Sequence, residues 1–205
     1  MLNLIVVLLS LRNSNASNKM IKKTKTIFSG FCLLFTLFAN SQDNFYTKSG
    51  NISFFSATSV ENIDAKNKSV VCLLIPQSGN LQFAVLIMGF EFKKALMQEH
   101  FNSDYLESDK FPKAEFTGKI MNNNGVDYRN NGTYSAYVEG KLTIHGVIKD
   151  VEATGTVTVK DGKLLANCTF NLLLADYHIK VPKLYRDNIS KSIKVIVGCT
   201  LDPLK

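Results

Sequence analysis

The chain has 205 residues and a formal net charge of +7, from 24 Lys and Arg against 17 Asp and Glu. This length is enough for one domain with a sizeable core. Five of the basic residues and none of the acids precede residue 42, which leaves 19 basic against 17 acidic residues, a net charge of +2, on the rest of the chain. So weak a charge argues against the dense basic surface of a nucleic-acid-binding protein.

Residues 20–41 have the pattern of a secretory signal peptide. They start with a methionine and several lysines, continue with an apolar run over residues 27–38, and end with the small residues Ala39 and Ser41. The run is shorter than the roughly 20 apolar residues of a membrane-spanning helix. We therefore predict cleavage after Ser41 and a periplasmic or secreted protein, and we interpret residues 1–19 as an over-extended N-terminus.

From residue 42 onward, apolar and polar residues alternate with the period of two that half-buried β-strands have. The clearest shared face consists of Leu164, Ala166, Cys168, Phe170, Leu172 and Leu174. The pattern predicts strands near residues 51–60, 69–75, 81–92, 114–121, 138–147, 151–160, 162–174 and 193–201. Because short turns separate most of them, we predict an antiparallel barrel or sandwich.

Two neighbouring segments depart from simple alternation. Residues 81–92 are apolar on both parities, which we interpret as a strand that is covered on both faces, on one side by a helix. That helix is predicted over residues 92–106, where apolar side chains recur at roughly helical spacing. Pro112 then favours an extended backbone before it, so a strand follows.

Patterns of catalytic and metal-binding residues are missing from the sequence. His100, His145 and His178 lie at none of the usual metal-ligand spacings, and there is no GxSxG motif or phosphate-binding loop. We therefore expect no catalytic residues, no metal site and no enzyme activity. A hydrolase or isomerase that uses His100 or His178 with a nearby acid stays open as an alternative.

Three cysteines, Cys72, Cys168 and Cys199, follow the predicted signal peptide, and no CxxC motif is present. An exported protein can pair two of them in a disulfide. Cys168 and Cys199 also fall on apolar parities, which favours buried thiols equally. Both readings stay open.

Many apolar side chains face the predicted interior, among them Phe83, Phe116 and Phe170. They can fill a solid core. A barrel of about eight strands is also wide enough to hold one apolar ligand. The alternation alone does not distinguish these two interiors.

Four segments share their order and spacing with a known family. They are GFEFKKALMQEHFNSDYLESDKFPKAEFTGKI, GKLTIHGVIKDVEATGTV, LADYHIKVPKL and the closing VIVGCTLDP. Together they resemble the bacterial YceI-like family of lipid- and polyisoprenoid-binding proteins. The resemblance covers about residues 45–203, and its most specific pieces are the His-Phe and Phe-Pro-Lys-Ala-Glu-Phe sequences and Gly-Lys-Leu-Thr-Ile-His-Gly.

This resemblance implies an all-β, lipocalin-like antiparallel barrel of about eight strands over residues 42–205, with one short helix inserted before the Phe-Pro strand. It implies an exported protein that holds a lipid chain in an apolar tunnel, for carriage, storage or sensing. The expected ligand is an isoprenoid quinone, a polyprenyl phosphate or another long-chain lipid, without any other cofactor. No nucleic-acid partner is expected, and peripheral contact with a membrane is compatible with this function.

The resemblance also suggests residues for the site. The candidate tunnel lining consists of Phe83, Val85, Ile87, Phe90, Phe92, Leu96, Phe101, Phe116, Leu142, Ile144, Phe170 and Leu172. The candidate polar residues at the tunnel mouth are His100, Tyr105 and Lys113. The alternative is a non-enzymatic interaction module of the cell envelope, whose barrel has a solid core and whose loops bind another protein.

Overall fold

The structure is a computed structural model that describes residues 43–204. The expected N-terminal extension and the expected signal peptide, residues 1–19 and 20–41, lie outside the described residues.

Strands dominate the described residues, and short helical segments connect some of them. The strands are β1 Phe45–Ala57, β2 Asn62–Ile75, β3 Asn80–Leu86, β4 Glu91–Phe92, β5 Lys113–Ile120, β6 Gly132–Ile144, β7 Val147–Lys160, β8 Lys163–Leu173 and β9 Ser192–Pro203. The helical segments are η1 Ile87–Gly89, α1 Ala95–His100, η2 Phe101–Tyr105, η3 Asn123–Gly125, η4 Leu174–Tyr177 and η5 Lys183–Tyr185.

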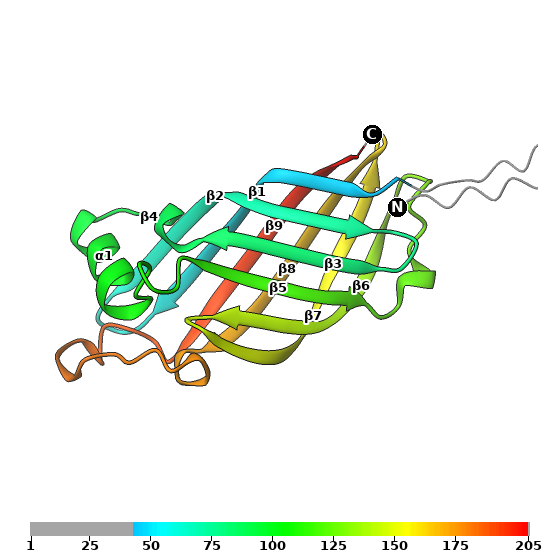
Figure 1. The fold of residues 1–205 in the computed structure, drawn as a ribbon. Coiled ribbons are helices and arrows are strands. Elements are labelled where there is room, and N and C mark those ends of the chain that lie inside the picture. Colours follow the sequence, from blue (N-terminus) through cyan, green and yellow to red (C-terminus); the bar gives the residue numbers. More distant parts are fainter. Residues whose placement is uncertain (1–42, 205) are drawn as a thin grey trace, which may run out of the picture. The chain divides into compact units, whose positions relative to one another are not determined.

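Eight of these strands close into an antiparallel barrel (Figure 1). Their order is β1-β9-β8-β7-β6-β5-β3-β2, and β1 pairs again with β2, which completes the circle. The two-residue strand β4 pairs separately with β2. Within this circle, β7 and β8 pair only between Gly155 and Lys160 of β7 and Lys163 and Cys168 of β8, and the two strands do not pair beyond Gly155 and Cys168. The predicted barrel of about eight strands is confirmed.

The period-2 pattern decides which side chains point into the barrel. Across β3, β5 and β6, the register aligns Phe83 with Phe116 and Phe116 with Leu142. Along β8 and β9, Phe170 lies opposite Val195. Successive side chains of a strand point to opposite faces, so each strand contributes every second residue to the interior.

The interpretation of residues 81–92 as one strand covered on both faces is wrong. β3 ends at Leu86, and the chain leaves β2 through η1 before β4 rejoins it. The buried side chain of Asn67 occupies this break, because its Nδ2 donates to the carbonyl oxygen of Leu86 at 2.9 Å. Leu86 and Met88 are 60% and 62% exposed, so no helix covers them.

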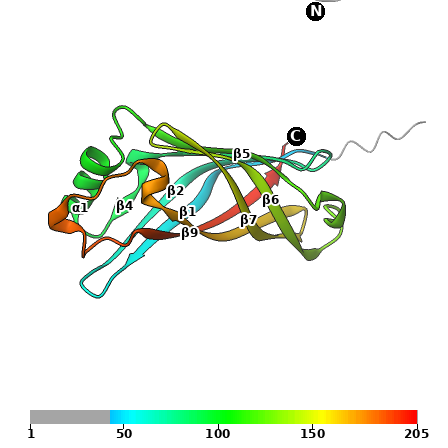
Figure 2. The same ribbon diagram turned by 90° about the horizontal axis from the view of Figure 1, so that it is seen from below.

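The predicted helix before β5 is present, with a shorter α-helical part. α1 covers Ala95–His100, and the chain continues for one π-helical turn, η2. The amide of Leu106 donates to the carbonyl oxygen of Phe101 at 3.0 Å and so closes this turn. Figure 2 shows α1 and the loop that contains η5 at the same end of the barrel.

A solid core closes the opposite end of the barrel. Leu164, Leu201 and Cys72 are fully buried there, at 0% exposure. The loop after β5 covers this core with Val126 and Tyr128, and the Tyr128 hydroxyl donates to Asn123 Oδ1 at 2.7 Å. Burial raises the pKa of Tyr128 to about 12. We call this end the packed end.

Candidate functional site

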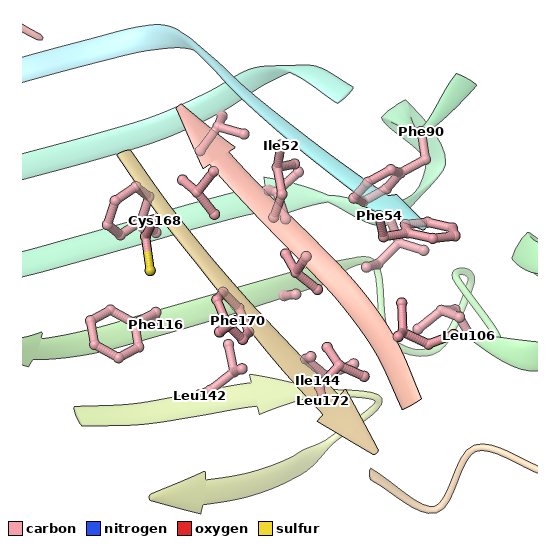
Figure 3. A pocket seen from close by; sticks show the side chains of 18 of the residues that line it. Ile52, Phe54, Phe90, Leu106, Phe116, Leu142, Ile144, Cys168, Phe170 and Leu172 are labelled. Atoms are coloured by element: carbon pink, nitrogen blue, oxygen red, sulfur yellow. The ribbon is translucent and has the colours of Figure 1, made fainter. Parts of the chain in front are cut away.

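An apolar cavity of about 480 Å³ lies inside the barrel (Figure 3). Its volume falls within the roughly 300–1,000 Å³ of typical ligand pockets. Carbon atoms form nearly all of its wall, which the barrel strands, α1 and η2 supply. Several inward side chains, such as Phe116 and Phe170, remain only half-buried because they border this empty space. A solid barrel core is therefore contradicted.

The structure places every candidate lining residue on the wall of this cavity: Phe83, Val85, Ile87, Phe90, Phe92, Leu96, Phe101, Phe116, Leu142, Ile144, Phe170 and Leu172. Sequence reasoning missed the contribution of β1, which supplies Ile52 and Phe54. A signal for it was present, because Ile52, Phe54 and the buried Ser56 alternate with Ser53 and Phe55.

Four phenylalanine rings cluster where the cavity meets η2. Phe101 lies 5.4 Å from Phe54, 5.6 Å from Phe90 and 5.0 Å from Phe92, measured between ring centroids. These distances are typical of favourable aromatic pairs. The cluster fixes the helical segment against β1 and β4, and it brings together residues that the sequence separates widely.

The ring of Phe116 lies against two glycines of neighbouring strands. Gly118 and Gly140 are cross-strand partners in β5 and β6. A Cβ atom at Gly118 would lie 2.4 Å from Cζ of Phe116, and one at Gly140 would lie 2.6 Å from the same atom. Only glycine leaves room for the ring to lie along the wall, so these glycines preserve cavity volume.

The mouth of the cavity lies between α1, the loop after η5 and the start of β2. His100 and Tyr105, two of the three candidate mouth residues, line it. Lys113 is not among the residues that line the cavity, but its Nζ lies 2.7 Å from Oε1 of Glu115, which does line it. A role of Lys113 at the mouth stays a prediction.

Three polar residues at the mouth escaped sequence reasoning. Lys94 Nζ lies 2.9 Å from Glu61 Oε1, and Asn188 Nδ2 donates to Glu61 Oε2 at 3.3 Å. The hydrogen bond with Lys94, followed by the one from Asn188, lowers the pKa of Glu61. Since 127 positions separate Glu61 from Asn188, no local motif could reveal this bridge.

His100 forms a pair with an acid on the same helical segment. Its Nδ1 lies 2.6 Å from Asp104 Oδ2, and the two side chains are 34% and 49% exposed. The hydrogen bond to His100, followed by that from Ser103, lowers the pKa of Asp104. The spacing of four residues is that of an ordinary helical ion pair. Of the two histidines in the enzyme alternative, His100 thus has an acid within hydrogen-bond reach, whereas His178 is exposed and lies beyond η4.

His145 lies among three segments that meet near the mouth. It lies in the turn between β6 and β7, and its side chain is 13% exposed. Its ring contacts Glu107 from the loop after η2, the backbone of Tyr177 in η4, and Phe111 at 4.6 Å between centroids. The Ile-His-Gly motif thereby connects three segments near the mouth.

Other chemistry is sparse in residues 43–204. Within them, no three His, Cys, Asp or Glu side chains come together as metal ligands. Cys72, Cys168 and Cys199 are free thiols in this structure, and the thiols of Cys72 and Cys199 are hydrogen-bonded to each other in the core. Cys168 lines the cavity, and burial raises the pKa of its thiol. Over the same part of the chain, every helix is too short or too polar to cross a membrane.

An eight-stranded antiparallel barrel with an apolar cavity inside it defines the class of lipocalin-like barrels with an internal ligand-sized space. Residues 28–201 match the YceI-like domain, and the chain belongs to this family. A comparison with curated proteins finds no match.

Solved structures share this fold. The chain is similar to a polyisoprenoid binding domain from Saccharophagus degradans implicated in plant cell wall breakdown, with a TM-score of 0.69, 12% identity, and coverage of 79% of this chain and 99% of that chain. Burkholderia cenocepacia BcnA matches with a TM-score of 0.60, 16% identity, and coverage of 74% and 95%. The Campylobacter jejuni YceI protein matches with a TM-score of 0.51, 16% identity, and coverage of 90% and 100%.

Proposed function

We propose that the protein binds one long-chain lipid of the polyisoprenoid class in its barrel and acts as a carrier, store or sensor without catalysing a reaction. The observation that carries this proposal is the apolar cavity of about 480 Å³. Burial of an apolar chain contributes ~0.8 kcal/mol per methylene. A chain of several isoprene units therefore binds without any strong polar contact.

The polar residues of the mouth favour a ligand with one polar end. Glu61, Lys94, His100 and Asn188 all border the cavity near α1 and the loop after η5, whereas Leu74, Leu81 and Ile120 line it toward the packed end. An isoprenoid quinone or a polyprenyl phosphate has this polarity, with an apolar tail and a polar head. The name of the Saccharophagus domain supports the polyisoprenoid class.

Co-purification tests the proposal directly. The purified protein is extracted with organic solvent and the extract is analysed by mass spectrometry, and delipidated protein is titrated with an isoprenoid quinone and a polyprenyl phosphate. We expect one lipid per barrel. A protein that carries no lipid and takes up neither compound would refute the proposal.

Matched variants locate the binding site. Phe170→Asp places a charge on the cavity wall, while Phe55→Asp places the same charge on an outward position that is 38% exposed. We expect Phe170→Asp to lose lipid and Phe55→Asp to keep it, with both folds verified by circular dichroism. Equal retention by two folded variants would mean that the lipid lies elsewhere.

The native cysteines offer a second readout. Cys168 lines the cavity, whereas Cys72 and Cys199 are 0% and 3% exposed and lie in the core. An apolar maleimide should label Cys168 alone in folded, delipidated protein, and bound lipid should slow this labelling. Labelling of Cys168 at the same rate with and without lipid would contradict occupancy of the cavity.

We further propose that the protein is exported to the periplasm or the medium. The signal-peptide pattern of residues 20–41 supports this location. Intact-mass analysis of the full chain expressed in a Gram-negative host should give a mature protein that begins at Gln42. An uncleaved protein recovered from the cytoplasm would exclude this location.

A further inference from the structure

Three segments around the cavity mouth carry exposed apolar side chains. Leu184 in η5 is 80% exposed and Val60 in the β1–β2 turn is 61% exposed, and neither lines the cavity. Leu96 of α1 and Tyr185 of η5 stand at the rim itself, 62% and 38% exposed. We call these four residues the rim face.

Contacts across the mouth hold these segments together. The salt bridge from Lys94 to Glu61 links α1 with the turn that contains Val60, and Asn188 extends it to the loop after η5. The rings of His100 and Tyr185 lie 6.0 Å apart. The backbone of Ser190 also donates to Ser56 Oγ at 2.9 Å. Figure 1 shows these segments at one end of the barrel.

The loop that carries Leu184 is basic. Residues 180–191 contain Lys180, Lys183, Arg186 and Lys191 but only one acid, Asp187. Within residues 43–204, none of these four cations takes part in an ion pair. Exposed apolar tips beside unpaired cations are typical of surfaces that insert into the headgroup region of anionic membranes.

We propose that the rim face and the basic loop 180–191 dock the barrel onto the surface of an anionic phospholipid bilayer, with the cavity mouth toward the lipid. This inference rests on the proposed function for its purpose. A long apolar chain is poorly soluble in water, so transfer between bilayer and cavity is easier when the mouth touches the membrane. Charge complementarity favours this occupant over an apolar protein groove.

Vesicle flotation tests the inference with the full-length purified protein. We expect binding to vesicles of phosphatidylcholine with phosphatidylglycerol, weak binding to phosphatidylcholine alone, and a decrease as salt is added. Leu184→Asp should weaken the binding by about tenfold, and the double variant Lys183→Gln with Arg186→Gln should weaken it by at least as much.

Matched controls lie at the packed end. Leu204→Asp changes an apolar side chain of 51% exposure that directly follows β9. The double variant Lys119→Gln with Lys160→Gln removes two charges near the packed-end termini of β5 and β7. These variants should bind vesicles as the unaltered protein does. Equal binding to both vesicle types, or an equal loss in the Leu204 variant, would overturn the docking surface.

Lipid content separates this inference from the proposed function. Because Leu184 does not line the cavity, the Leu184→Asp protein should keep its bound lipid. A protein that retains lipid but never binds vesicles refutes docking alone, whereas an empty protein that binds vesicles refutes the proposed function alone. A dimer that Leu184→Asp dissociates, without vesicle binding, would assign the rim face to a second copy of the chain and overturn the proposal.

Discussion

The imidazole of His145 lies between two acceptors: its Nε2 is 3.1 Å from Glu107 Oε2, and its Nδ1 is 3.2 Å from the carbonyl oxygen of Tyr177. Both ring nitrogens therefore face oxygen, and the ring edge meets Phe111. This arrangement fixes the loop after η2 and the turn of η4 to the β6–β7 hairpin. His145 stabilises the mouth end of the barrel, where the cavity removes much of the ordinary packing.

Replacement of His145 should therefore destabilise the protein. We expect His145→Asn to lower the free energy of unfolding by about 1–3 kcal/mol, because it leaves a buried acceptor unpaired. His178 is a matched control, since its backbone φ is 56° against 51° for His145 and its side chain is exposed. Urea denaturation should give His178→Asn nearly the stability of the unaltered protein. An equal loss of unfolding free energy in the two variants would contradict the structural role of His145.

Carboxylates at the mouth end should make stability depend on pH. The hydrogen bond with Lys110, followed by that with His145, lowers the pKa of Glu107 from its ordinary 4.5. A lowered pKa in the folded state means that the stabilisation is present above about pH 4.5 and is lost as the pH falls through the lower folded value. Glu61 and Asp104 act in the same direction.

Melting temperatures between neutral pH and about pH 3 check this expectation. The unaltered protein should lose thermal stability below about pH 4.5, and Glu107→Gln should lose less. Asp109→Asn is the control, because Asp109 forms no ion pair within residues 43–204, and its melting temperature should fall with pH as that of the unaltered protein does. The same fall of melting temperature with pH in all three proteins would contradict the assignment to Glu107.

Two leucines of β8 should report the difference between the packed end and the part of the barrel that contains the cavity. Leu164 and Leu172 share one face of the strand, but Leu164 is fully buried in the solid core while Leu172 borders the cavity and is half-buried. We expect Leu164→Ala to cost about 2–5 kcal/mol of unfolding free energy. Leu172→Ala should cost about 1 kcal/mol. Equal costs, measured by denaturant unfolding, would indicate a uniformly packed interior.

Gly140 should tolerate no side chain. A Cβ atom there would lie 2.5 Å from both Thr117 O and Gly118 Cα, and backbone atoms of a paired strand cannot move away easily. We expect Gly140→Ala to cost about 1–3 kcal/mol and to push the ring of Phe116 into the cavity, which reduces lipid uptake.

Gly125 offers the control for this substitution. Nothing lies within 4 Å of a Cβ atom at this position, so Gly125→Ala should change the unfolding free energy by less than about 0.5 kcal/mol. Calorimetry and lipid titration on both variants check the two effects. A Gly140→Ala protein with unchanged stability and uptake would show that the β5–β6 contact is looser than its geometry implies.

Much of the fold follows from local pattern. The alternation of Leu164, Cys168 and Phe170 predicts an inward face, and the structure confirms it because a barrel strand has one buried side. Strand ends were less predictable. β1 begins at Phe45, ahead of the predicted residue 51, because pairing with β2 and β9 extends the strand through polar residues whose pattern alone is weak.

The errors come from interactions between distant residues. The break after Leu86 depends on the side chain of Asn67, 19 positions earlier, and the apolar composition of residues 81–92 does not predict it. The sequence pattern does not predict the bridge from Glu61 to Asn188 either.

The packed end gives the barrel a floor. Val126, Tyr128 and Leu164 close the interior there, whereas Glu61 and His100 border the cavity at the other end. If an apolar chain occupies the cavity as proposed, it meets this floor, and any length beyond the depth of the cavity lies outside the barrel. The distance from the rim to this floor would then limit the length of chain that the barrel encloses.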